Sequence, residues 1–92
     1  MIVNIDKEKL RAFLASCEDA EEVGKDEYTV DLYDTEPAIS MNIEFTKDGV
    51  DVLAALFLEF DEEQDGWYLG EKTKDVELIE KALRQALAGS AC

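Results

Sequence analysis

The apolar residues of this chain change their spacing along the sequence, from helical to strand-like and back. Near the N-terminus, four apolar residues recur at i, i+3, i+4 and i+7, which places them on one face of a helix: Leu10, Phe13, Leu14 and Cys17. Asp6 is a favourable N-cap residue, and Gly24 is a typical helix stop. We therefore predict a helix over residues 6–23.

Alternation of apolar and polar residues follows, as in strands that bury one face and expose the other. It predicts strands at residues 27–33, 38–46 and 50–60, separated by turn residues. Residues 66–70 are a candidate for a short fourth strand after an acidic turn.

The second and third predicted strands are joined by a hairpin signal, Asp48-Gly49. A two-residue turn there places Phe45 opposite Val52 and makes every cross-strand pair on that face apolar, whereas a shift by one residue mixes the faces. The third strand is also apolar on its other face, at three alternate residues: Leu53, Ala55 and Phe57. Either another part of the chain covers them, or they form a partner or dimer interface.

A second helix is predicted over residues 75–88, with an apolar stripe at helical spacing: Val76, Ile79, Leu83, Ala86 and Leu87. Asp75 or Thr73 would cap its start, and residues 89–92 would form a frayed tail. The order is α-β-β-β-(β)-α, an α+β fold whose antiparallel sheet has helices packed on one face. Residues 1–92 are expected to form a single domain.

The composition shows that this domain is strongly acidic. The chain has 23 acidic and 9 basic residues, which gives a formal net charge of -14 at pH 7. Its hydrophobic content of 47% is too high for a disordered acidic tail, so we expect a folded domain. The charge argues against direct binding to nucleic acid or to an anionic membrane, since both require Lys and Arg. It favours a basic protein partner, cations, or solubility alone.

The chain contains no histidine, which excludes Ser-His-Asp and Cys-His catalysis and histidine metal sites. No carboxylate pair has a spacing that singles it out, so we expect no enzyme, no catalytic residue and no cofactor. Residues 61–66 match the start of a calcium-binding EF-hand loop except at Glu63, where Asp or Asn is usual. The twelfth position is Lys72 where a bidentate Glu is needed, so we expect no metal site. No apolar run suits a membrane span or a signal peptide, which favours the cytoplasm.

The acidic residues gather in two segments. Residues 18–36 hold nine acids against one Lys, and residues 59–71 hold six acids and no base. We predict that fourteen of these acids and one tyrosine bind the partner: Glu18, Asp19, Glu21, Glu22, Asp26, Glu27, Asp31, Tyr33, Asp34, Glu36, Glu59, Asp61, Glu62, Glu63 and Asp65.

The first segment conflicts with the electrostatics of the predicted first helix. Acids at residues 18–22 would lie at its C-terminus, where the macrodipole makes each one unfavourable by about 0.3–1 kcal/mol at low salt. Such conflicts often mark functional sites. The alternative is that the helix ends near Cys17 and these acids occupy a loop.

Aromatic residues lie close to the acids in the sequence: Tyr28, Tyr33, Trp67 and Tyr68. Aromatic rings beside charge suit interface anchors and stacking by arginine. Carboxylates on alternate strand residues lie about 6–7 Å apart, a spacing comparable to that of successive phosphates on a nucleic-acid strand. A folded protein with such a grid can occupy an Arg- and Lys-lined groove meant for DNA or RNA.

The segment "KDEYTVDL" (residues 25–32) follows the first predicted helix. In this segment, and in length, acidity and order of elements, the chain resembles small acidic inhibitors of phages and mobile elements, namely DNA-mimic anti-restriction proteins and anti-CRISPRs. The resemblance implies a non-enzymatic inhibitor in the host cytoplasm. It would bind a basic nucleic-acid-binding effector, such as a CRISPR effector, and block DNA binding through a nucleic-acid-mimicking face.

Three other functions fit the same sequence. An immunity protein that neutralises a nuclease toxin would use the same electrostatics with a different partner. An adaptor or dimeric chaperone-like domain would instead use the apolar residues of the third strand. The charge would otherwise serve solubility alone.

Overall fold

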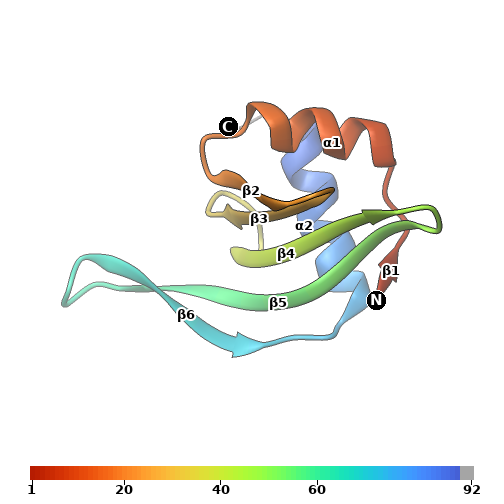
Figure 1. Cartoon of the computed structure of the whole chain (residues 1–92). Coiled ribbons are helices and arrows are strands. Elements are labelled where there is room, and N and C mark those ends of the chain that lie inside the picture. Colours follow the sequence, from red (N-terminus) through yellow and green to blue (C-terminus); the bar gives the residue numbers. More distant parts are fainter. Residues whose placement is uncertain (90–92) are drawn as a thin grey trace.

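The structure, a computed structural model, describes residues 1–89 and contains one antiparallel sheet and two helices (Figure 1). The elements are β1 (Ile2–Val3), α1 (Lys7–Ser16), β2 (Ala20–Gly24), β3 (Glu27–Leu32), β4 (Ile39–Thr46), β5 (Gly49–Asp61), β6 (Gly66–Lys72) and α2 (Val76–Gly89). The strand order is β1-β5-β4-β3-β2, and β6 pairs with β5 outside this path. The predicted α+β class, with an antiparallel sheet and helices on one face, is confirmed. The predicted tail lies outside the described residues from position 90 onward.

The core lies between the two helices and one face of the sheet. Every second residue of β3 and β4 is buried there, as their alternation predicts. The helices contribute six fully or almost fully buried residues: Leu10, Leu14, Ile79, Ala82, Leu83 and Ala86. Cys17 is also buried in this cluster. Within residues 1–89 the buried side chains are all apolar, so the charge of the described chain lies at its surface.

Side chains cap the start of both helices, as the sequence predicts. The Asp6 carboxylate accepts a hydrogen bond from the backbone N–H of Lys9 at 3.0 Å. The Asp75 carboxylate accepts from the N–H of Glu77 at 3.1 Å, and the Thr73 hydroxyl accepts from the N–H of Asp75 at 3.1 Å. A cap of this kind stabilises a helix by about 1 kcal/mol.

The predicted helix over residues 6–23 is wrong beyond Ser16. α1 ends there with Cys17 as its C-cap, and after a turn the chain forms β2, which pairs antiparallel with β3. Asp26 adopts a φ of 59° between these strands, a left-handed conformation that Asp tolerates better than most residues. The early helix end is confirmed, and it leaves Glu18 and Asp19 just beyond the C-terminus of α1. Glu21 and Glu22 lie in β2, where no helix dipole acts on them, rather than in a loop.

The β4–β5 hairpin forms as predicted, but in a different register. Phe45 pairs with Val50 rather than Val52, and Thr46 pairs with Gly49 at the turn. Farther along, a register irregularity gives β5 one residue more than β4, and this extra residue is Leu53. Such a bulge reverses the side-chain alternation beyond it.

The reversal changes which residues of β5 are buried. Ala55 is 3% exposed and belongs to the core, whereas the neighbouring Ala54 is exposed; unbroken alternation predicts the opposite. Leu53 is 47% exposed, and Phe57 is half-buried opposite Ile39. Leu53, Ala55 and Phe57 therefore do not form a single exposed patch, as the alternative of a dimer interface would require, because Ala55 lies inside the molecule.

Strand β5 extends beyond the rest of the sheet. Phe57 is its last residue that pairs with β4, and the residues that follow pair with β6. Residues 58–69 therefore form a projecting hairpin, called the arm below, which Figure 1 shows extending away from the helices. The molecule measures 43 × 25 × 25 Å. Within residues 1–89, β2 pairs only with β3 and β6 only with β5, so both are edge strands.

Replacing Ala55 by Glu should destabilise the protein far more than replacing Ala54 by Glu. A carboxylate at position 55 would lie in the apolar core, so Ala55→Glu should lower the free energy of unfolding by about 3–5 kcal/mol. At the exposed position, Ala54→Glu should change it by about 0.5 kcal/mol or less. Urea denaturation followed by circular dichroism measures both. A larger loss for Ala54→Glu would show that β5 lacks the extra residue.

Candidate partner-binding surface

The arm is a two-stranded ribbon closed by a compact turn. Phe60 pairs with Trp67 across the ribbon. In the turn, the Asp61 carboxylate accepts a hydrogen bond from the N–H of Glu63 at 2.9 Å, and Asp65 adopts a φ of 51°. Asp is favoured in both positions because it can bond its own backbone and tolerates the left-handed region. Two of the acids at the tip therefore shape the turn as well as carrying charge.

A close approach between the two strands holds Glu59 at the base of the arm. β6 is irregular at this point relative to β5. A Cβ added at Gly70 would clash with the Glu59 carboxylate and lie 3.2 Å from the carbonyl oxygen of Phe57. Glycine at position 70 thus lets the Glu59 side chain pack across the backbone of β6.

Three aromatic rings join the arm to the body. The ring centroids of Tyr33 and Trp67 are 5.1 Å apart, and those of Phe60 and Trp67 are 5.4 Å apart, both in T-shaped contact. Tyr33 directly follows β3, so this contact ties the arm to the end of the sheet. Each such pair contributes roughly 0.5–1.5 kcal/mol beyond area burial. Trp67 is nevertheless 44% exposed and Phe60 is 46% exposed.

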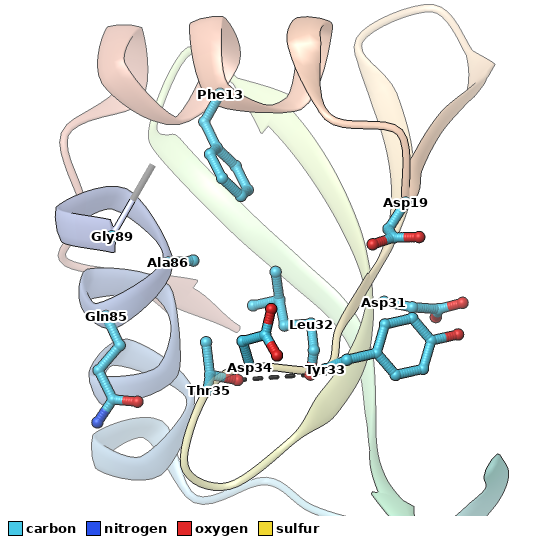
Figure 2. Close-up of a pocket in the computed structure, with 10 residues that line it drawn as sticks. All are labelled: Phe13, Asp19, Asp31, Leu32, Tyr33, Asp34, Thr35, Gln85, Ala86 and Gly89. Atoms are coloured by element: carbon cyan, nitrogen blue, oxygen red, sulfur yellow. Dashed lines mark hydrogen bonds between the residues drawn. The ribbon is translucent and has the colours of Figure 1, made fainter. Parts of the chain in front are cut away.

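A cavity of about 90 Å³ opens beside Tyr33 at the same end of the molecule. Figure 2 shows Phe13 pointing into it from α1, with the end of α2 on one side. Its apolar lining includes three side chains: Phe13, Leu32 and Ala86. Three carboxylates also line it: Asp19, Asp31 and Asp34. The cavity therefore combines an apolar lining with negative charge.

Three cations of the described chain form ion pairs, and all three pair with acids away from the cavity and the arm. The ion pairs within residues 1–89 join the Met1 amine to Asp51 at 2.7 Å, Arg11 to Asp26 at 3.2 Å and Arg84 to Glu80 at 3.7 Å. None of them involves an acid of the cavity or of the arm. The arm itself has five acids and no base, so its negative charge is uncompensated.

The titration of Tyr33 reflects this negative surrounding. Burial raises the pKa of Tyr33 above its ordinary value of 10.0, and the charges of Asp31 and Asp19 raise it further. Tyr28 follows the same direction: burial, and then a hydrogen bond to Glu22 and the charge of that carboxylate, raise its pKa. In both cases the phenolate form is disfavoured because it would be partly desolvated beside existing negative charge.

The predicted site residues divide between the two ends of the molecule. Nine line the cavity or lie on the arm, at the end from which the arm projects: Asp19, Asp31, Tyr33, Asp34, Glu59, Asp61, Glu62, Glu63 and Asp65. Two more adjoin the cavity, because Glu18 precedes Asp19 and the Glu36 N–H donates to Gln85, which lines it. Three lie at or near the β2–β3 turn at the other end: Glu22, Asp26 and Glu27. Glu21 lies between, opposite Thr29. The surface formed by residues 18–19, 31–36 and 58–69 is called the acidic end below.

Some residues of the charged and aromatic surface lie outside the predicted site. Phe60 and Trp67 form the aromatic contact of the arm, which depends on the pairing of β5 with β6. Glu44 pairs with Glu27 on one side and with Asp51 on the other, which makes a row of three acids across the face without helices. Alternation in the sequence already predicts that Glu44 lies on the solvent-exposed face. Its position opposite Asp51 depends on the register of β5.

No group of three or more His, Cys, Asp or Glu residues within residues 1–89 is placed to hold a metal ion. No helix in the same part of the chain is long and apolar enough to cross a membrane. Comparison with protein-family models, with curated proteins and with solved structures finds no match to this chain. Its function must therefore be inferred from its surface.

Replacing Asp31 by Asn should lower the pKa of Tyr33 toward 10.0, because a negative charge beside the phenol is removed. Asn keeps an oxygen that can accept the hydrogen bond of Ser40. NMR of the labelled tyrosine ring carbons during alkaline titration measures the pKa, and Glu77→Gln on α2 is the control.

The sign of the linked stability follows from the raised pKa. Tyr33 stabilises the fold while it is protonated, and this contribution is lost as the pH rises above 10 and through the folded-state pKa. In the Asp31→Asn experiment, an unchanged pKa of Tyr33 would contradict the influence of the Asp31 charge on the phenol.

Proposed function

We propose that this chain is a non-enzymatic inhibitor that binds a basic nucleic-acid-binding effector and blocks its access to DNA, in the manner of an anti-CRISPR. The observation that carries the proposal is the acidic end. Residues 18–19 and 31–36 hold five carboxylates, the arm holds five more, and neither part has a basic residue. A protein groove that binds a nucleic-acid backbone carries the opposite charge.

The shape of the arm supports the same proposal. It is a thin ribbon that projects from the sheet (Figure 1), so it can enter a groove that the body of the molecule cannot. Glu59 and Asp61 lie two residues apart on β5, which corresponds to about 6–7 Å along a strand. This spacing is comparable to that of successive phosphates, so the arm can meet cations that are arranged for a nucleic-acid backbone.

Opposite charge on the two partners accelerates association more than it strengthens the final complex. An inhibitor of this kind would associate rapidly with its target and would then exclude DNA by occupancy. Because the acids are at the surface, added salt should weaken the complex. The aromatic rings of the arm supply contacts that do not depend on salt.

A competition experiment tests the proposal. Labelled DNA is titrated with a guide-loaded CRISPR effector, with and without this protein, at roughly 0.1 M and roughly 1 M salt, where the Debye length falls from about 10 Å to about 3 Å. The protein should weaken DNA binding at low salt. Its own complex with the effector, measured directly without DNA because DNA also binds weakly at high salt, should weaken as the salt is raised. The immunity-protein alternative enters as a second target, a basic nuclease. Unchanged DNA affinity for both targets at low salt would contradict the proposal.

A matched pair of charge reversals localises the effect. Glu62→Lys with Glu63→Lys changes two exposed acids of the arm, and Glu8→Lys with Glu77→Lys changes two exposed acids of the helices by the same total charge. We expect the arm variant to inhibit about tenfold less well and the helix variant to lose less than about threefold. Equal losses would show that net charge alone matters, and not its position on the arm.

A further inference from the structure

The fold already contains one arginine that is held by an aromatic ring and a carboxylate together. The guanidinium carbon of Arg11 lies 4.4 Å from the centroid of the Phe45 ring, and its Nη1 donates to the Asp26 carboxylate at 3.2 Å. The planar guanidinium can stack on a ring while its edge donates hydrogen bonds to an oxygen acid. This arrangement holds the guanidinium against a ring and a carboxylate of the same chain, although the Arg11 side chain remains 44% exposed.

The acidic end offers the same two groups without an arginine. Trp67 and Phe60 are about half exposed on the arm, and Leu69 in the same strand is 59% exposed. Exposed apolar side chains gathered on a projecting element mark an interaction site. Asp61 and Trp67 line the same open pocket on the arm, and Asp31 acts on the neighbouring Tyr33. No base within the acidic end competes for these rings and carboxylates.

We infer that the acidic end recognises arginine side chains of a basic protein partner, with the guanidinium stacked on Trp67 and its N–H groups donating to the nearby carboxylates. The inference rests on the proposed function, because it presupposes a basic partner. It adds that the acidic end recognises arginine side chains of that partner in preference to lysine side chains. A guanidinium presents five donors in a plane and is weakly hydrated. A lysine ammonium is a compact, strongly hydrated charge that cannot stack in this way.

Charge decides against a second copy of this chain as the occupant. Each copy has a net charge of -14, and two acidic ends brought face to face would repel each other. The partner must therefore bring positive charge to the rings, which an arginine-bearing surface does.

Trp67 is the only tryptophan of the chain, so its fluorescence reports directly on this site. The protein is titrated with an oligoarginine peptide and with an oligolysine peptide of equal length and charge at roughly 0.1 M salt. We expect oligoarginine to change the Trp67 emission and to bind about threefold to tenfold more tightly than oligolysine. Equal affinity for both peptides, with unchanged emission, would overturn the inference.

Three variants separate stacking from charge and from simple apolar contact, with affinity measured by calorimetry. Trp67→Leu keeps an apolar side chain but has no ring face, so this variant should bind oligoarginine and oligolysine with about equal affinity. Trp67→Phe keeps a ring and should retain part of the preference, which also shows that the arm remains folded. Leu69→Ala removes exposed apolar area in the same strand and should leave the preference unchanged.

The outcomes for this inference and for the proposed function are distinct. A preference for arginine that survives in Trp67→Leu overturns the inference, as does a salt-insensitive dimer in sedimentation that is lost in Trp67→Leu. If either occurs while the protein still competes with DNA for an effector, the proposed function stands on charge alone. If the arginine preference depends on Trp67 but no basic target is inhibited, the arginine site stands and the proposed function fails.

Discussion

Strand β5 forms backbone hydrogen bonds along both of its edges, with β4 on one side and with β1 and β6 on the other. Its first half therefore lies inside the sheet, and its last residues have only β6 beside them. One extra residue, Leu53, decides which side chains of this strand enter the core. Because the same strand continues into the arm, the packing of the core and the direction of the arm are set by a single element.

Charge and apolar packing are kept apart throughout the described chain. The buried residues are apolar, and the ion pairs are few and at least partly exposed. Pairs of that kind contribute about 0–1 kcal/mol each, so the core must offset the self-repulsion of a strongly acidic surface. The acids that lack a partner within residues 1–89 are a cost that solubility or binding must justify. The Tyr33–Trp67 contact brings the acids of the arm and those around Tyr33 to one end of the molecule, next to an aromatic surface.

Local patterns were sufficient for part of this structure. The cap at Asp6, the stripe of α2 and the alternation of β3 and β4 are properties of neighbouring residues, and the sequence predicts them correctly. β2 could not be predicted in the same way, because its short, acidic sequence has no apolar face and becomes a strand only by pairing with β3. The helical period from Leu10 to Cys17 therefore predicts a longer helix than α1, which ends at Ser16.

The register of β5 and the candidate site depend on contacts between distant residues. The bulge at Leu53 cannot be recognised from the sequence, because the residues around it are apolar on both faces of β5 and both registers bury apolar side chains. The segments richest in acid were visible in the sequence, but their division between two ends of the molecule was not. The meeting of Tyr33 with Trp67 needs the topology that brings the end of β3 beside the arm.

The bare edges of the arm have a consequence for how the molecule behaves at high concentration. A projecting ribbon with unpaired backbone groups is a template on which another chain can add a strand and begin a fibre. The carboxylates on the arm repel the arm of another copy, which opposes such strand addition. The same acids can thus keep the free protein dispersed, and any polycation that cancels them would remove that protection and invite aggregation.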